Sequence, residues 1–161
     1  MTVTVKVRGA RETSAALRDL AKYVSVPLNA TSRFALQPLL TAARRNVRAL
    51  DLKDTTGALA ASLTIKYKKS PKLGPVHQVG PASLAMRGDR RPIKYAHLLE
   101  FGTAPRAKKP GPGWTHPGAA PKPWLTPAYY STRDEVVKRF GERFGPEMEK
   151  RAAKLNRKKV T

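Results

Sequence analysis

The stretch YAHLLEFGTAPRAKKPGPGWTHPGAAPKPWLTPA, residues 95–128, decides how the second half of the chain folds. Two short apolar segments stand at its ends, and residues 104–120 between them form a loop rich in Pro, Gly and Lys. The first segment is expected to form a short buried turn or strand, which Gly102 ends by supplying a positive φ. Its buried side chains are expected to be Tyr95, Leu98, Leu99 and Phe101.

The second apolar segment, PKPWLTPA, presents Trp124 and Leu125 from a backbone that three prolines make stiff. A large aromatic side chain in this setting is expected to anchor either the core or an interface. Trp114 lies within the loop, between Gly113 and Thr115. It is expected either to contact a neighbouring chain or to lie on its own domain, and the sequence leaves both readings open.

A chain of 161 residues is long enough to bury a core as a single domain. We expect that domain to span residues 1–153, with residues 154–161 as a basic C-terminal tail. The absence of cysteine excludes disulfides and thiolate metal sites. The charged, alternating start does not resemble a signal peptide, and no apolar run approaches membrane-spanning length. A soluble protein in a reducing cytosol is therefore expected.

The formal net charge is +21, from 32 Lys and Arg against 11 Asp and Glu. Self-repulsion at this level disfavours a compact free monomer, so an anionic partner is expected, either nucleic acid or an acidic protein surface. The alternative is a merely solubilising surface. The candidate contact residues are Arg87, Arg90, Arg91, Lys108, Lys109, Arg157, Lys158 and Lys159.

The first third of the chain shows one strand pattern and two helix patterns. Residues 2–8 alternate Val with polar residues, which predicts a half-buried strand. A helix is predicted over residues 13–24, with Pro27 interrupting it. A second helix is predicted over residues 31–50, where Pro38 marks either a kink or the true start.

A hairpin is predicted in the middle of the chain. After a Thr-Thr-Gly turn, residues 58–63 are predicted to form a short helix. The next strand has Leu63, Ile65 and Tyr67 pointing inward, and residues 76–79 form the returning strand.

A long C-terminal helix completes the predicted elements. It is expected to begin near Thr132, where Thr132 and Glu135 form a capping box, and to bend or break near Gly145. The predicted fold class is therefore α+β, with a small antiparallel sheet packed against a long N-terminal helix and a long C-terminal helix, and with extended loops.

No catalytic constellation is apparent in the sequence. The three histidines, His77, His97 and His116, are far apart and lack metal-ligand spacing. His97 and Glu100 lie three residues apart and could share a helical face, but a lone pair of this kind is more typical of structure than of a site. We therefore expect no enzymatic activity, no cofactor, no metal and no small-molecule substrate.

Three motifs occur in a fixed order: Thr-Gly-x-Leu-x-x-Ser, Tyr-Ala-x-x-x-Glu-x-Gly-Thr and Pro-aromatic-Leu-x-Pro-Ala. The residues that carry them are Thr56, Gly57, Leu59 and Ser62; Tyr95, Ala96, Glu100, Gly102 and Thr103; and Pro123, Trp124, Leu125, Pro127 and Ala128. Over roughly residues 13–150 the chain resembles the tail-completion or minor-tail-component family of long-tailed bacteriophages, which is related to lambda minor tail protein Z. Trp124 departs modestly from the commoner Phe, and the basic tail lies outside the pattern.

The resemblance implies a structural virion protein of the head–tail junction, made in the host cytoplasm. It implies a homo-oligomeric ring, most often sixfold, which joins the capsid connector to the tail terminator or tail tube around the DNA channel. The residues expected to serve as anchors or interface contacts are Tyr95, Glu100, Phe101, Gly102, Trp114, Trp124 and Leu125. The alternative is a basic nucleic-acid-binding module such as a ribosome-associated protein, although Tyr67 is the only aromatic residue available on the best predicted strand.

Overall fold

The computed structural model describes residues 10–50, 57–70, 74–82, 92–107 and 115–159. The predicted strand over residues 2–8 lies outside these ranges. The elements, in chain order, are α1 (Ala10–Ala35), α2 (Gln37–Ala49), α3 (Ala58–Ser62), β1 (Leu63–Ser70), β2 (Gly74–Pro81), α4 (Pro92–Phe101), β3 (Arg106–Ala107), β4 (Thr115–His116) and α5 (Leu125–Lys159). The fold is α+β, as the sequence predicts.

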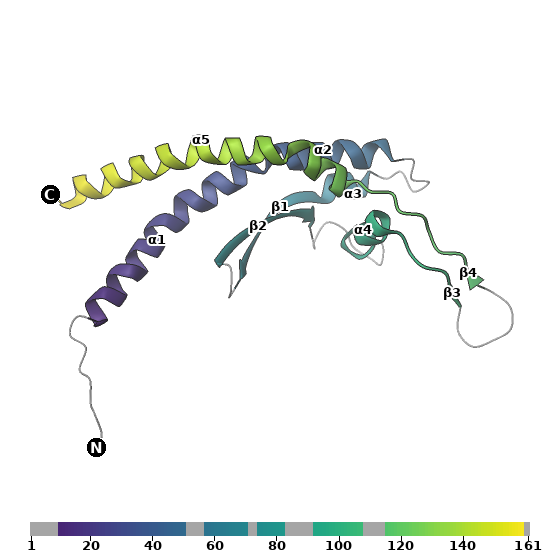
Figure 1. The fold of residues 1–161 in the computed structure, drawn as a ribbon, viewed down its shortest axis with the longest axis horizontal. Helices are drawn as coiled ribbons and strands as arrows, with labels where there is room; N and C mark the ends of the chain where they lie inside the picture. The colour runs from purple at the N-terminus through teal and green to yellow at the C-terminus, as the bar shows by residue number, and fades with distance from the viewer. Residues whose placement is uncertain (1–9, 51–56, 71–73, 83–91, 108–114, 160–161) are drawn as a thin grey trace, which may run out of the picture.

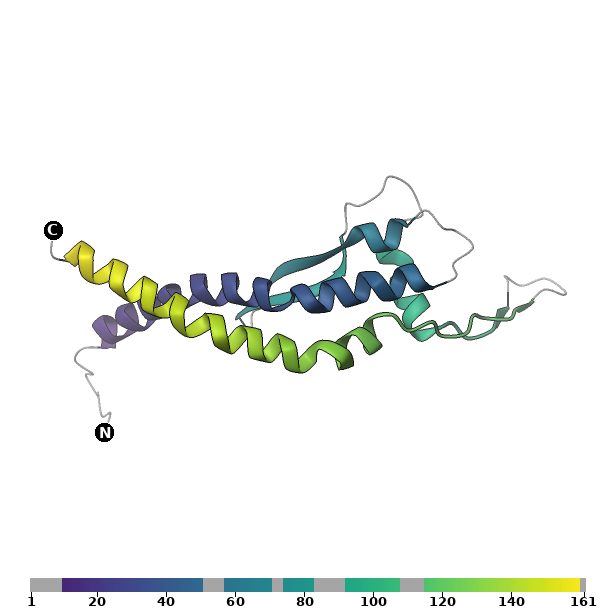
Figure 2. The same cartoon turned by 90° about the horizontal axis from the view of Figure 1, so that it is seen from above.

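The molecule is elongated, with its long helices on one side (Figures 1 and 2). α5 lies against α2 and part of α1, and the β1–β2 hairpin lies below these helices. The start of α1 and the end of α5 lie at the same end of the molecule, where the two helices diverge. The β3–β4 ribbon extends from the opposite end.

The core of the described residues lies where α2, α3, α4, the base of the hairpin and the start of α5 meet. It contains many small side chains, which allow these elements to approach closely. Its buried members are Leu40, Ala42, Ala43, Val47, Leu59, Ala60, Leu63, Ala96, Trp124 and Ala128. The core therefore occupies one part of a long subunit, and large stretches of α1 and α5 lie beyond it.

The predicted break at Pro27 is wrong, because α1 continues through this residue to Ala35. Proline removes one helical hydrogen bond, at a cost of about 3 kcal/mol in an isolated helix. Here Pro27 is buried and α1 packs along α5, where the Tyr23 hydroxyl donates to the Met148 carbonyl at 3.3 Å. Tertiary packing therefore outweighs the local preference. The break falls instead at Leu36, and Pro38 lies in the first turn of α2.

The β1–β2 hairpin forms with the alternation that the sequence predicts. Leu63 pairs with Pro81 and Ile65 with Val79, and this face packs on the core. Tyr67 was expected to point into the core, but its side chain is 56% exposed. It lies further along the strand, away from the base that packs on the core, and its ring contacts His77 of the partner strand.

The first apolar segment of the 95–128 stretch lies in a helix, α4, and not in the predicted short turn or strand. The prediction that Leu98 and Phe101 are buried is also wrong, because they are 39% and 74% exposed. The helical period instead turns Ala96 and Glu100 into the core. Gly102 ends α4 with φ +73°, as predicted.

α5 begins at Leu125, so the predicted start and capping box at Thr132 are wrong. The Thr132 hydroxyl donates within the helix to the Ala128 carbonyl at 2.8 Å. α5 is also not interrupted near Gly145, and it continues as helix through most of the predicted basic tail, residues 154–161. α5 contacts α1 and α2, and its contacts with Tyr23 of α1 extend to Met148 and Arg151.

The loop over residues 104–120 is partly an antiparallel ribbon. Thr103 and Ala119 exchange two backbone hydrogen bonds, of 2.9 and 3.0 Å, and β3 pairs with β4 beyond them. Gly118 has φ +85°, and an added Cβ there would meet the Thr103 carbonyl oxygen. The two apolar segments are thus connected by backbone pairing at the base of the loop.

We expect Gly102→Ala to lower the free energy of unfolding by about 2–3 kcal/mol, since a left-handed residue with a Cβ is strained. The added Cβ would also lie 2.6 Å from the Ala119 carbonyl oxygen. Urea denaturation measures the loss. Gly141→Ala is the matched control, because it lies within α5 with open space around it and should gain about 0.5–1 kcal/mol. Equal effects of the two substitutions would contradict the role assigned to Gly102.

Candidate functional site

The Glu100 carboxylate, which belongs to α4, binds the backbone N–H groups at the start of α5. Its Oε2 accepts the backbone N–H groups of Trp124, at 2.8 Å, and Leu125, at 2.9 Å. Its Oε1 accepts the N–H of Thr126 at 2.8 Å. These donors lie at the helix N-terminus, where no carbonyl of the preceding turn is available to them. Glu100 is therefore the N-terminal cap of α5, supplied from α4.

The surroundings of Glu100 favour its ionised form. Burial by itself raises the pKa of the carboxyl, but the N–H groups of Leu125, Trp124 and Thr126, with the Thr126 hydroxyl, outweigh it and hold the pKa below its usual value. The positive end of the α5 dipole acts in the same direction. A negative charge is thus kept in a site that is only 7% exposed.

Trp124 connects three helices. Its side chain is 3% exposed, and its indole N–H donates to the Ala96 carbonyl of α4 at 3.3 Å. Its own carbonyl accepts the side-chain amide of Asn46, from α2, at 3.0 Å. The predicted anchoring role of Trp124 is confirmed within the chain itself, and Leu125 is partly buried beside it.

The three sequence motifs meet in this core. In the first, Gly57 opens α3 with φ +62°, Leu59 is buried, and the Ser62 hydroxyl donates to the Leu59 carbonyl at 2.8 Å. The second supplies Glu100 and the third supplies Trp124. Residues that are far apart in the sequence therefore build one structural unit. Thr56 lies outside the described residues.

The structure describes only some of the other residues that were predicted to form the site. Tyr95 is half-buried against the core, whereas Phe101 is exposed. The side chains of Arg157, Lys158 and Lys159 lie on the last turns of α5 and are not described. The remaining predicted residues outside the described ranges are Arg87, Arg90, Arg91, Lys108, Lys109 and Trp114.

Large apolar side chains are exposed along the whole subunit. Phe101, Val137 and Tyr130 are 74%, 72% and 65% exposed, which is unusual for side chains of this size on ordered helices. Concentrations of such side chains mark contact surfaces. The exposed apolar side chains of α4 lie on the side of this helix that faces away from the core. The other exposed apolar side chains lie on α1, β1 and α5. The full set is Leu17, Leu20, Val26, Phe34, Tyr67, Ile93, Leu98, Phe101, Tyr129, Tyr130 and Val137.

A mainly apolar groove of about 380 Å³ lies between α1, β2 and α5. Burial, followed by the charge of Arg33, lowers the pKa of His77 in its wall, so this imidazole is mostly neutral at pH 7. The groove therefore suits apolar side chains better than ions. Its lining residues are Ser32, Ala35, Leu36, Val76, His77, Val136, Val137 and Phe140.

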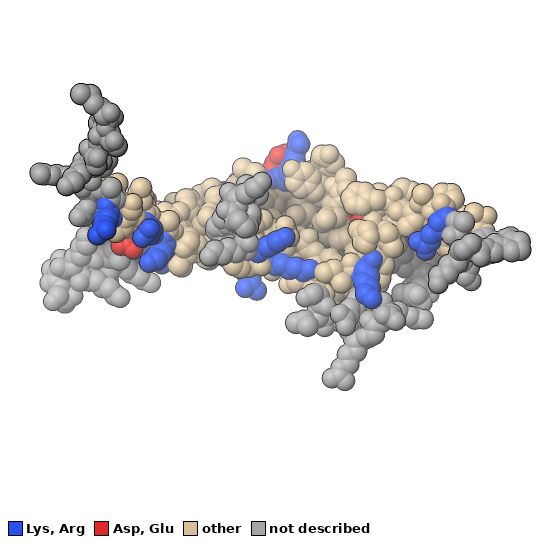
Figure 3. Space-filling view, turned by 90° about the horizontal axis from the view of Figure 1, so that it is seen from below, with Lys and Arg blue, Asp and Glu red and all other residues tan. Residues whose placement is uncertain are grey.

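Charge is distributed unevenly over the subunit. On the face that carries the hairpin, Lys and Arg are spread over the hairpin and α4, whereas Asp and Glu are few (Figure 3). Among the described residues from Gln37 to Arg133, Glu100 is the only carboxylate, and it is buried. The other described carboxylates lie on α1 and on α5 from Asp134 onward.

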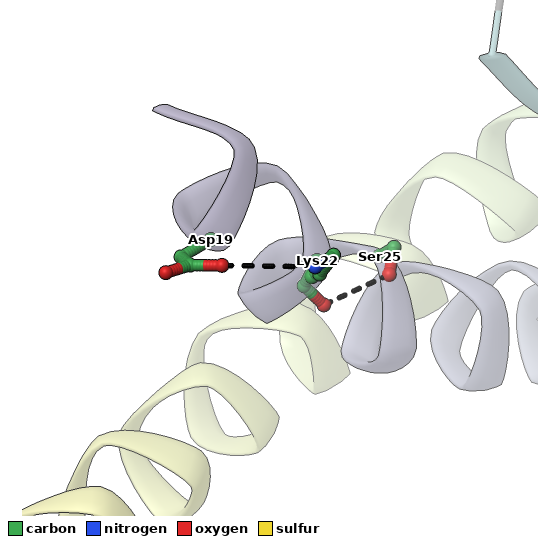
Figure 4. Close-up of polar contacts among 3 residues, drawn as sticks. All are labelled: Asp19, Lys22 and Ser25. Atoms are coloured by element: carbon green, nitrogen blue, oxygen red, sulfur yellow. Dashed lines mark hydrogen bonds and ion pairs between the residues drawn. The ribbon is translucent and has the colours of Figure 1, made fainter. Parts of the chain in front are cut away.

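Most of those carboxylates are paired with cations. On α1, Asp19 lies 3.7 Å from the Lys22 ammonium, and the Ser25 hydroxyl donates to the Lys22 carbonyl (Figure 4). On α5, Glu135 pairs with Arg139, and Glu142 approaches Lys138 at 3.9 Å. The cations of the hairpin face have no such neighbours on their own strands.

Among the described residues, no cluster of three or more His, Cys, Asp or Glu is placed to hold a metal ion. His97 is exposed, and both oxygens of Glu100 are used by α5, so this pair does not form a ligand site. None of the described helices combines the length and the apolarity needed to cross a bilayer. Comparison with protein-family models, curated proteins and solved structures finds no match to this chain.

We expect Glu100→Gln to lower the free energy of unfolding by about 1–3 kcal/mol near pH 7, because an amide replaces the charge that the buried donors require. Because the folded pKa is depressed, the carboxylate contributes stability above its unfolded value of 4.5, and this is lost as the pH falls through the folded pKa.

Denaturation between pH 7 and pH 2 measures this effect. The wild-type protein should lose more stability than Glu100→Gln below about pH 4.5. Glu149→Gln, at an exposed position of α5, is the control and should leave the acid dependence nearly unchanged. Parallel curves for wild type and Glu100→Gln would contradict the capping role.

Proposed function

We propose that this chain is a structural virion protein of the phage head–tail junction, a neck or tail-completion subunit. In this proposal copies form a ring, most often sixfold, which joins the capsid connector to the tail terminator or tail tube around the DNA channel. The protein has no catalytic task and needs no cofactor. It is made in the host cytoplasm and acts in the virion.

The observation that carries the proposal is the exposed apolar surface of an elongated subunit. Side chains such as Phe101, Tyr130 and Val137 lie on ordered helices with most of their surface in water. Each would contribute about 1.5–3 kcal/mol if it were buried. A subunit that completes its burial against neighbours accounts for this surface, and a free monomeric enzyme does not.

The resemblance in sequence gains support from the core. The three motifs use their distinctive residues for one task, which is to bring α3, α4 and the start of α5 into one core. Glu100 caps the helix, Gly102 ends α4, and Trp124 is buried in the core. An ordered set of motifs that builds a single core is what a shared family fold would produce.

Ring formation is compatible with two different apolar surfaces on one subunit. The groove between α1, β2 and α5 and the outer arc of α4 involve different residues, such as Phe140 and Phe101. Contacts between unlike surfaces generate rings when the rotation closes, whereas identical patches generate dimers. This favours a ring over a simple dimer.

The net charge of +21 favours a second candidate, a free nucleic-acid-binding module such as a ribosome-associated protein. The two functions differ in their solution behaviour. A free module binds nucleic acid as a monomer, whereas a neck subunit self-associates without nucleic acid. Neighbouring genes for portal and tail-tube proteins would favour the first candidate.

We expect Phe101→Ser to weaken self-association at least about tenfold, because exposed aromatic residues are typical interface hot spots. Its free energy of unfolding should change by no more than about 0.5 kcal/mol, because the side chain contacts little in the subunit. Light scattering coupled to size exclusion measures the first quantity, and urea denaturation the second. The control is Ala49→Ser, at an exposed position of α2.

Trp124→Ala is expected to behave differently, because this residue is buried. It should cost about 3–5 kcal/mol of stability and hinder assembly through loss of the fold. Incorporation into virions at the normal level by both Phe101→Ser and Trp124→Ala would contradict the proposed role. A wild-type protein that stays monomeric at high concentration would do the same.

A further inference from the structure

The outer face of the β1–β2 hairpin is a mainly polar surface. Alternation along β1 turns Thr64, Lys66 and Lys68 away from the face that packs on the core. In the antiparallel register Gln78 lies opposite Lys66, and Gly80 opposite Thr64. This set of residues, 64, 66, 68, 76, 78 and 80, is called the outer hairpin face below.

Every polar side chain of the outer hairpin face can donate a hydrogen bond. Thr64 offers a hydroxyl, Lys66 and Lys68 offer ammonium groups, and Gln78 offers an amide. Val76, in register with Lys68, is the apolar member of this face, and it also lines the groove beside α5. The face therefore has several donors and no carboxylate.

The lysines of this face are not neutralised by their described neighbours. No ion pair joins Lys66 or Lys68 to any residue that the structure describes, whereas Lys138 and Lys150 of α5 lie within 4 Å of carboxylates. Figure 3 shows Lys and Arg over the hairpin, with few Asp or Glu nearby. A cation without an anionic neighbour keeps its full attraction for an external anion.

The face is also open to close approach. An added Cβ at Gly80 would meet nothing within 4 Å, so the backbone itself can come near a ligand. Residues two apart on a strand are about 6.6 Å apart, and phosphates of one DNA strand follow each other every 3.4 Å along the helix axis. Lys66 and Lys68 can therefore reach phosphates of the same strand.

We propose that the outer hairpin face binds the phosphate backbone of duplex DNA without reading its sequence. This inference rests on the proposed function, in which the subunit surrounds a DNA channel, and it names the surface that faces the DNA. Ammonium, hydroxyl and amide donors are the groups that contact phosphate oxygens in protein–DNA complexes.

The chemistry of the face favours DNA over an acidic protein. The centre of a protein interface is normally depleted of charge and contains large apolar or aromatic anchors. The outer hairpin face has lysines at its centre and no aromatic residue, because Tyr67 belongs to the opposite face by alternation. Duplex DNA requires only a row of donors that follow the backbone.

Fluorescence anisotropy with a labelled 20-base-pair duplex, titrated at several salt concentrations, tests the proposal with the full chain. The double variant Lys66→Gln/Lys68→Gln should bind about tenfold more weakly at moderate salt, with its salt slope reduced by about 1 per lysine. Gln78→Glu, a nearly isosteric change that adds one negative charge, should also weaken binding several-fold. Two duplexes of unrelated sequence should bind equally.

Matched controls separate this surface from the effect of net charge. Lys138→Gln/Lys150→Gln removes the same charge from cations that already have carboxylate neighbours. Gln37→Glu repeats the isosteric change at an exposed position of α2. Both controls should retain nearly wild-type affinity. Equal losses in the variants and their controls would overturn the proposal, because binding would then depend on net charge alone.

Two further results would overturn the proposal. One is a wild-type protein that does not bind the duplex. The other is a polyglutamate peptide that displaces the duplex and loses affinity in the same variants, because the face would then suit an acidic protein. Light scattering on the same samples keeps the two proposals apart. Ring formation without DNA binding rejects this inference alone, and failure to assemble rejects the proposed function.

Discussion

The whole subunit depends on the contact between the Glu100 carboxylate and the first N–H groups of α5. A helix N-terminus carries unpaired donors and a partial positive charge, and here a buried anion from α4 satisfies both. The same contact sets the direction in which the longest helix leaves the core. Because α5 then contacts α1 and α2, this carboxylate helps to place the three longest helices relative to one another.

This arrangement divides the subunit into two parts with different physical properties. Around Glu100 and Trp124 the elements are closely packed, and the positive φ of Gly102 ends α4. Away from that centre, α1 and α5 diverge, and large apolar side chains remain in water. A closely packed core with exposed apolar surfaces away from it suits a subunit that buries those surfaces against its neighbours in an assembly. This is the basis of the proposed role in a neck ring.

Charge follows the same division. Most carboxylates of α1 and α5 lie beside cations of their own helix, so part of the positive charge of these helices is neutralised locally. The hairpin has lysines and no acidic residue, so its field extends into solvent. Assembly and contact with DNA would therefore use different surfaces, apolar for neighbouring subunits and cationic for phosphate. The experiments above can separate them because the substituted residues of one surface do not belong to the other.

The sequence by itself determined the elements whose pattern is local. Alternation predicted the hairpin and its packed face at Leu63 and Ile65, glycine chemistry predicted the end of α4 at Gly102, and the proline-flanked Trp124 was correctly expected to be an anchor. Only the tertiary structure decided where α5 begins, because its cap is Glu100, which belongs to another helix. Likewise, α1 passes through Pro27 since packing outweighs the lost hydrogen bond, and Phe101 is exposed because Ala96 and Glu100 occupy the inner arc of α4. Local sequence specifies the periodicity of an element. Contacts between segments decide which side of a helix is buried and which distant side chain caps a helix end.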